Sequence, residues 1–133
     1  SLGDAYSDPV NAGVYRTKNG GKSWDRVLNV DGKAGCSDID LNPQNPNILY
    51  ASFWQLKITT WNLDSGGEYS GVYKSEDGGD TWKKLSGIGT GLPGTAEHPL
   101  GKVAVQVAPS EPNRVYVLTE EEGGPVFYRS DNS

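Results

Sequence analysis

The segment GVYRTKNGGKSW at residues 13–24 decides the fold, because the chain repeats it. It returns as GVYKSEDGGDTW at residues 71–82, and VFYRSDNS at residues 126–133 begins a third copy. Each full copy joins two runs of strand-forming residues through Gly-Gly, a pair that takes the positive φ values of a tight hairpin turn. The repeat therefore predicts a series of similar β-hairpins.

A second repeat alternates with the first. DLNPQNPNILYA at residues 40–51 returns as QVAPSEPNRVYV at residues 106–117, and the two repeats follow each other in the same order. Each unit predicts four short strands, which in the complete unit span residues 37–41, 48–54, 71–75 and 81–85. Four-stranded antiparallel meanders repeated every 60 or so residues are typical of β-propeller blades. We therefore expect an all-β chain made of propeller blades.

The repeats divide the chain into three parts. Residues 1–35 form the end of one blade, residues 36–86 form a complete blade, and residues 87–133 form a partial third blade that ends inside a hairpin turn. About two blades make an incomplete ring, so the first and last strands present unpaired edges. The expected consequence is self-association through these open blade edges, strand exchange at the termini, or a longer native chain.

The Gly-Gly turn has a clear physical logic. In SEDGGDTW, the Asp77 carboxylate is suited to accept hydrogen bonds from turn amides, and Trp82 is large enough to fill the space between two sheets. The pattern Ser/Thr-x-Asp-x-Gly-x-Thr-Trp resembles the Asp box, or BNR repeat, of bacterial sialidases, xyloglucanases and sortilin-type propellers. Together with the Asn-Pro-rich turn of residues 42–47, the chain most resembles bacterial sortilin-like (Vps10-like) proteins, which are often labelled glycosyl hydrolases.

This resemblance implies a structural role for the box residues. They are Thr17, Asn19, Gly21, Trp24, Ser75, Asp77, Gly79, Trp82, Ser130 and Asn132. Asn19 replaces the expected Asp in the first copy and Ser133 replaces the expected Gly in the third, so we expect weaker capping there. The resemblance also implies a secreted, periplasmic or cell-surface protein.

Strand parity predicts where a ligand would bind. In a meander, the box turns lie on one rim, and the loops of residues 29–36, 55–70 and 86–101 lie on the other. The middle loop is much longer than its repeat equivalent at residues 120–124, and long loops of repeat proteins often carry recognition.

Two aromatic residues of the long loop are candidate ligand-binding residues. Trp61 and Tyr69 are suited to stack on a sugar or to hold a peptide. Alternatively, Trp61 folds back as a small core of the loop itself.

Asp38 and Asp40 are the only carboxylate pair with suggestive spacing. Their separation by two positions places both on one face of a strand, which in a propeller blade lines the central channel. They are weak candidates for catalytic carboxylates of a glycosidase, and Asp38 is also a candidate ligand-binding residue. Alternatively, both satisfy turn amides or face water in the channel, because their repeat equivalents are Ala104 and Gln106.

Composition argues against several classes of protein. A net charge of −5 with dispersed basic residues disfavours nucleic-acid binding. No apolar stretch is long enough to span a membrane, and the single cysteine, Cys36, forms no internal disulfide. His98 has no His or Cys neighbour, so we expect neither a metal site nor a cofactor.

The resulting functional hypothesis is a non-catalytic binding or scaffolding propeller. It recognises a protein, a peptide or a carbohydrate on the rim opposite the boxes. The rival hypothesis is a glycoside hydrolase, xyloglucanase-like or sialidase-like, whose catalytic carboxylates lie mostly outside these 133 residues.

Overall fold

The computed structural model describes residues 1–4, 6 and 9–132, and these residues form eleven β-strands and no helix. The strands are β1 (Val14–Arg16), β2 (Asp25–Leu28), β3 (Gly35–Leu41), β4 (Leu49–Trp54), β5 (Leu56–Ile58), β6 (Leu63–Ser65), β7 (Gly71–Ser75), β8 (Lys83–Lys84), β9 (Val103–Val107), β10 (Val115–Glu121) and β11 (Gly124–Ser130). The described residues therefore contain no helix that could cross a membrane.

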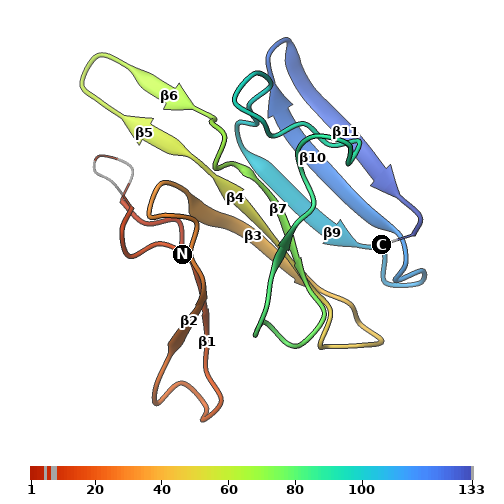
Figure 1. Cartoon of the computed structure of the whole chain (residues 1–133). Coiled ribbons are helices and arrows are strands. Elements are labelled where there is room, and N and C mark those ends of the chain that lie inside the picture. The colour runs from red at the N-terminus through yellow and green to blue at the C-terminus, as the bar shows by residue number, and fades with distance from the viewer. Residues whose placement is uncertain (5, 7–8, 133) are drawn as a thin grey trace.

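The strands form three successive antiparallel blades, which do not close into a ring (Figure 1). The first blade is the β1–β2 hairpin, the second is the four-stranded sheet β3-β4-β7-β8, and the third is the sheet β9-β10-β11. Every named strand pair is antiparallel. The predicted fold class, all-β with four-stranded meander blades in an incomplete ring, is confirmed.

The complete blade differs from its prediction in two details. The loop between β4 and β7 contains a hairpin of its own, β5–β6, which forms a separate two-stranded sheet. The fourth strand was expected over residues 81–85, but β8 spans only Lys83–Lys84. Its start is delayed because the amides of Asp80 and Thr81 bind the Asp77 carboxylate instead of a neighbouring strand.

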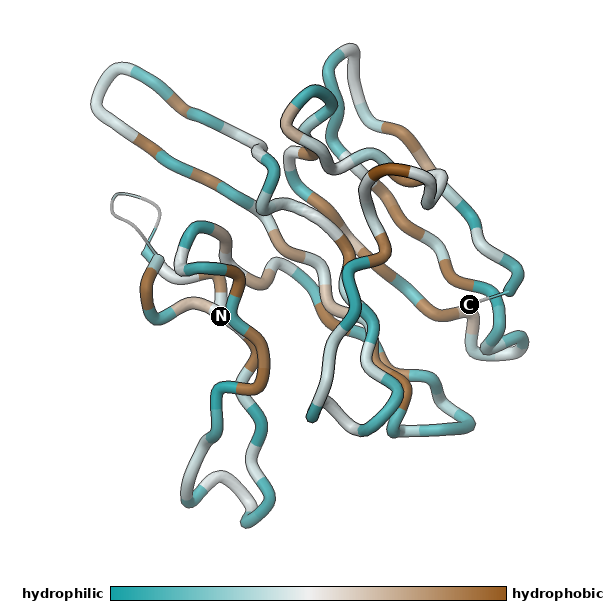
Figure 2. Tube along the Cα trace, viewed as in Figure 1, coloured by the Kyte–Doolittle hydropathy of each residue, from teal (hydrophilic) through white to brown (hydrophobic). Residues whose placement is uncertain are grey.

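The hydrophobic core lies between the blades. One cluster joins the first and second blades and contains Val14, Val30, Ala34, Ala51 and Phe53. The other joins the second and third blades and contains Tyr50, Val72, Leu100, Val103, Val105, Val107, Val115 and Val117. Figure 2 shows these apolar segments along the strands, with hydrophilic turns between β3 and β4. The middle blade alternates its side chains, so that Ala51 and Phe53 face one neighbour while Tyr50 and Val72 face the other.

The box turns have the local geometry that the sequence predicts. We call residues 17–24 box 1, residues 75–82 box 2 and residues 130–132 box 3; Ser133 lies outside the described residues. In box 2, Asp77 Oδ1 accepts hydrogen bonds from the amides of Asp80 and Thr81, at 3.0 and 2.8 Å. The Ser75 hydroxyl accepts one from the amide of Gly79 at 2.9 Å, and Gly78 and Gly79 have positive φ values of 72° and 92°. The turn thus satisfies its own amides.

Box 1 repeats this pattern with an amide in place of the carboxylate. Asn19 Oδ1 accepts a hydrogen bond from the Ser23 amide at 2.9 Å, and the Thr17 hydroxyl accepts one from the Gly21 amide at 2.9 Å. Box 3 begins in the same way, because the Ser130 hydroxyl donates to Asn132 Oδ1 at 3.0 Å. The polar residues of the boxes therefore bind the turn that contains them.

Candidate functional site

The rim opposite the boxes carries the longest connections of the chain. In Figure 1, the β5–β6 hairpin, the segment of residues 86–101 and the β10–β11 turn lie at the upper end of the blades. The turns of box 1 and box 2 lie at the lower end. We call the upper end the loop rim. Its position agrees with the strand-parity prediction.

The β5–β6 hairpin projects from this rim. Leu56, Lys57 and Ile58 pair with Ser65, Asp64 and Leu63. The tip is closed by Thr59, whose amide donates to the Asn62 carbonyl at 2.7 Å and whose hydroxyl accepts from the Asn62 amide at 3.1 Å. Alternating apolar residues and a Thr-Asn turn explain why this segment forms a hairpin.

Trp61 lies at the tip of the hairpin and is 87% exposed. The alternative in which Trp61 folds back as a core of the loop is therefore wrong. The side chain of Leu63 on the returning strand is also exposed, at 59%. Covering side chains of this size with a binding partner stabilises the complex, since each square ångström of apolar surface buried contributes about 25 cal/mol.

A polar network anchors the base of the hairpin to the third blade. The Trp54 indole Nε1 donates to Ser65 Oγ at 3.1 Å, and Ser65 Oγ donates to Glu120 Oε2 at 2.7 Å. The same Glu120 oxygen accepts a hydrogen bond from the Lys102 amide at 3.0 Å. These bonds, that from the Lys102 amide first, lower the pKa of Glu120, which therefore stays ionised. The network was not predicted, because it joins residues from three separate segments.

Tyr69 has different surroundings from Trp61. It is half-buried and packs against the core cluster between the first and second blades. The neighbouring Glu68 carboxylate raises the pKa of Tyr69. The structure does not bring Tyr69 and the hairpin tip together, so a shared stacking site of Trp61 and Tyr69 has no geometric support.

Asp38 and Asp40 lie in the seam between the second and third blades. Each half-buried carboxylate uses one oxygen to accept a hydrogen bond from the amide of the next residue, and the other to accept one from an amide of β9. The amides are those of Ile39 and Val105 for Asp38, at 2.9 and 3.2 Å, and of Leu41 and Val107 for Asp40, at 2.9 and 2.7 Å.

This arrangement accounts for both carboxylates without a substrate. β9 is an edge strand of its sheet, so the amides of Val105 and Val107 on its free side need acceptors. The two Asp side chains supply them, and Ser37 and Ser52 add hydroxyl hydrogen bonds to the Val103 carbonyl at 2.7 and 2.8 Å. The residues act as ties between neighbouring blades.

The segment of residues 86–101 forms a second feature of the loop rim. It surrounds a hollow of about 490 Å³ lined by Gly87, Ile88, Pro93, Thr95, Ala96, Glu97 and His98. Ile88 is 94% exposed, and the carbonyl of His98 accepts hydrogen bonds from the amides of Gly94 and Thr95. The hollow could not be predicted from the sequence, because this Gly- and Pro-rich segment shows no strand or helix periodicity.

The remaining candidates show no reactive arrangement. Cys36 is half-buried, its pKa is raised chiefly by that burial, and its thiol donates to the Asp38 carbonyl at 3.3 Å. Within residues 1–4, 6 and 9–132, no three His, Cys, Asp or Glu side chains gather closely enough to hold a metal ion.

Comparison with known proteins adds no family assignment. Neither a scan of the sequence against protein-family models nor a search of curated proteins found a match.

Proposed function

We propose that this chain is a segment of an Asp-box propeller of the sortilin-like kind, and that it binds a glycan or peptide ligand on the loop rim without catalysing a reaction. The observation that carries the proposal is the β5–β6 hairpin, which holds Trp61 almost fully exposed at its tip. Exposed tryptophans are frequent anchors of binding surfaces, since they bury a large area at a small cost in side-chain entropy.

The anchoring of the hairpin supports this role. A binding loop loses less entropy on binding when it is already ordered. Here the hairpin has its own strand pairing, and its base is joined to Glu120 and Lys102 of the third blade through Ser65. Lys102 Nζ also lies 5.7 Å from the centre of the Trp54 ring. The tip is thus presented on an ordered support.

The hydrolase alternative has less support. A glycosidase requires one carboxyl group that donates a proton and a second that acts as nucleophile or base on the sugar. All four oxygens of Asp38 and Asp40 already accept backbone hydrogen bonds. Both groups are thus engaged in holding neighbouring blades together.

The experiment is a screen of the chain on glycan and peptide arrays, followed by affinity measurements on the best ligand. We expect Trp61→Ala to weaken binding by more than about tenfold, because truncating an anchoring tryptophan costs on the order of 2 kcal/mol. Trp24→Ala is the matched control, since Trp24 is also exposed but lies in box 1. Equal affinities of wild type and Trp61→Ala would contradict the proposal.

A reducing-sugar release assay on polysaccharides tests the alternative in parallel. We expect no turnover. Release of sugar that Asp38→Asn abolishes, in a variant that keeps the wild-type unfolding midpoint, would establish the hydrolase and overturn the non-catalytic proposal.

A further inference from the structure

Box 1 contains a sequence that favours loss of a side-chain amide. Asn19 is followed by Gly20, and no other asparagine of the 133 residues precedes a glycine. A glycine presents its backbone nitrogen to the preceding asparagine side chain without the hindrance of a β-carbon. Asn19 is therefore the asparagine of this chain at which deamidation meets the least steric resistance.

The hydrogen bonds of box 1 hold the Asn19 amide at both its oxygen and its nitrogen. Asn19 Oδ1 accepts hydrogen bonds from the Ser23 amide at 2.9 Å and from the Thr17 hydroxyl at 3.0 Å. Asn19 Nδ2 donates to the Ser23 hydroxyl at 2.7 Å. All three bonds are made within the turn, so they do not depend on how neighbouring blades pack.

These partners are suited to promote attack on the amide carbon. When a nucleophile adds to Asn19 Cγ, negative charge develops on Oδ1, and the Ser23 amide and the Thr17 hydroxyl are placed to stabilise it. The Ser23 hydroxyl lies next to Nδ2, in position to give a proton to departing ammonia. The turn thus supplies the groups that cleavage of an amide requires.

This position of the box is open to water. Asn19 and Gly20 are exposed. Asp77, the equivalent of Asn19, is exposed as well, although Arg16 of the first blade holds box 2 through two hydrogen bonds. Exposure therefore belongs to this position of the box and persists when a neighbouring blade packs against it.

Box 2 shows that the turn accommodates a carboxylate. Asp77 Oδ1 accepts hydrogen bonds from the Thr81 amide and the Ser75 hydroxyl, both at 2.8 Å, and Oδ2 accepts one from the Thr81 hydroxyl at 2.5 Å. Ser23 and Thr17 stand at the equivalent positions of box 1. The bonds from Thr81, followed by that from Ser75, lower the pKa of Asp77, so it stays ionised. An ionised carboxylate resists further attack by the backbone nitrogen, so a carboxylate formed in such a turn persists.

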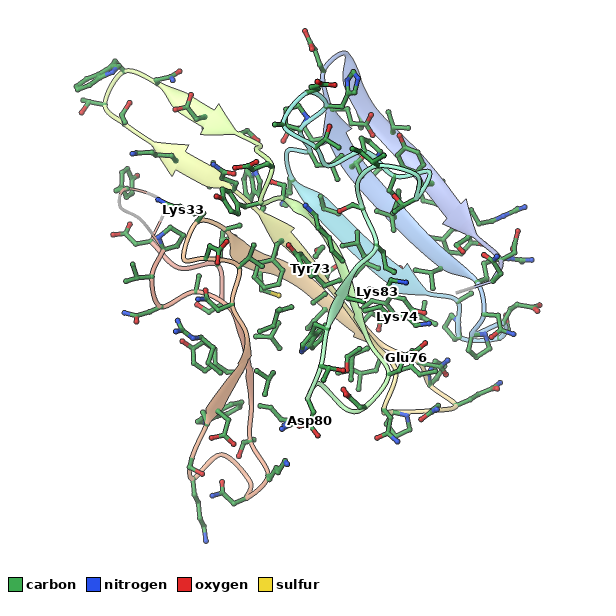
Figure 3. All side chains as sticks on the ribbon, viewed as in Figure 1. Lys33, Tyr73, Lys74, Glu76, Asp80 and Lys83 are labelled. Atoms are coloured by element: carbon green, nitrogen blue, oxygen red, sulfur yellow. The ribbon has the colours of Figure 1, made fainter. Side chains whose placement is uncertain are left out.

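The charges beside box 1 also favour a carboxylate. Lys18 and Lys22 flank Asn19 in the sequence, whereas Glu76 and Asp80 stand at the equivalent positions of box 2. Figure 3 shows Glu76 and Asp80 at the lower end of the second blade. A negative charge at residue 19 would thus lie near two cations, while the box 2 carboxylate lies near two anions.

We propose that box 1 is a deamidation site at which Asn19 is converted to aspartate, so that box 1 gains the carboxylate that box 2 already has. The Gly20 nitrogen attacks Asn19 Cγ, loses its proton to solvent and expels Nδ2 as ammonia, which leaves a cyclic succinimide. Water then adds to Cγ, the bond between Cγ and the Gly20 nitrogen breaks, and that nitrogen regains a proton. Addition of water to the backbone carbonyl carbon would instead give isoaspartate, whose additional backbone carbon moves the carboxylate away from its donors. The donors to Oδ1 direct water to Cγ and so favour aspartate.

The test compares the folded chain with a synthetic peptide of residues 17–24 during incubation at neutral and at mildly alkaline pH. Peptide mapping by mass spectrometry with electron-based fragmentation measures the ratio of aspartate to isoaspartate at residue 19. We expect this ratio to be at least about fivefold higher in the chain, as for one further hydrogen bond that favours one product. Asn62, which precedes Leu63, is the internal control and should keep its amide. An unconverted Asn19 in the chain after the peptide has reacted, or equal ratios in chain and peptide, would overturn the proposal.

Two variants test the donors of box 1. Thr17→Val and Ser23→Ala each remove one hydroxyl, and circular dichroism verifies that each variant keeps the wild-type fold. In both, the ratio of aspartate to isoaspartate should fall toward the value of the peptide. The Asn19→Asp chain is the reference for complete conversion, and the incubated wild type should acquire its unfolding midpoint. Unchanged ratios in both folded variants would overturn the role of the box in directing the reaction.

Discussion

Box 1 and box 2 have nearly the same turn but different surroundings. In both, a Ser or Thr hydroxyl and an Asn or Asp side chain accept hydrogen bonds from amides two to four residues away. Trp24 of box 1 is 58% exposed, whereas Trp82 of box 2 is half-buried against the first blade. The comparison teaches that the box forms its turn locally, while the environment of its tryptophan depends on the neighbouring blade.

The largest difference in the free energy of unfolding is expected between alanine substitutions of the two tryptophans. Trp82→Ala should lower the free energy of unfolding by about 2 kcal/mol, less than a fully buried aromatic residue because Trp82 is only half-buried. Trp24→Ala should change it by less than about 0.5 kcal/mol, as is usual for exposed positions. Urea unfolding followed by circular dichroism measures both. Equal destabilisation by the two changes would break the comparison.

The cations that correspond to each other in the two blades give a smaller difference. Arg16→Ala should cost about 1 kcal/mol, because it removes hydrogen bonds to the Gly78 carbonyl and to Asp80. Lys74→Ala removes a solvated ion pair with Glu76 and should cost less than about 0.5 kcal/mol. The same unfolding assay compares them. A Lys74→Ala variant that is less stable than the Arg16→Ala variant would contradict the stabilising role given to the Arg16 hydrogen bonds.

The smallest expected difference between the two boxes is in how the free energy of unfolding depends on pH. Hydrogen bonds from the Thr81 hydroxyl, the Thr81 amide and Ser75 lower the pKa of Asp77. A folded-state pKa below the unfolded value of about 4 contributes stability at neutral pH, and this contribution is lost as the pH falls below about 4. Asp77→Asn, which copies Asn19 of box 1, should be less stable than wild type at pH 7 and lose less stability in acid.

Asn19→Asp is the reciprocal change and should add an acid-sensitive contribution to box 1. Unfolding midpoints at pH 7, 5 and 3 measure both variants. Parallel pH profiles for wild type and Asp77→Asn would exclude the carboxylate of Asp77 as an acid-sensitive group.

The fold was predictable because its signals are local and repeated. Gly-Gly turns, alternating strands and Asn-Pro turns specify hairpins from adjacent residues, and Asp77 and Asn19 bind the amides that their spacing indicates. Strand parity alone predicted that the box turns lie together on one rim. A repeat also identifies equivalent positions, which is why Arg16 and Lys74 can be compared at all.

The candidate site was less predictable because its contacts are long-range. Nothing in the sequence near Asp38 reveals that its carboxylate accepts a hydrogen bond from Val105, or that Ser65 donates one to Glu120. Trp61 was correctly placed in the long loop, but its exposure depends on the β5–β6 hairpin, which was not predicted within that loop. Tyr69 lies close to Trp61 in sequence, yet it packs against the core.

The central claim is that binding takes place on the loop rim and that the boxes are structural. Hydrogen exchange of the chain, with and without the strongest ligand found on the arrays, tests it most directly. The account predicts slowed exchange in residues 55–70, with box 1 and box 2 unchanged. Slowed exchange in residues 17–24 or 75–82, with none in residues 55–70, would contradict it.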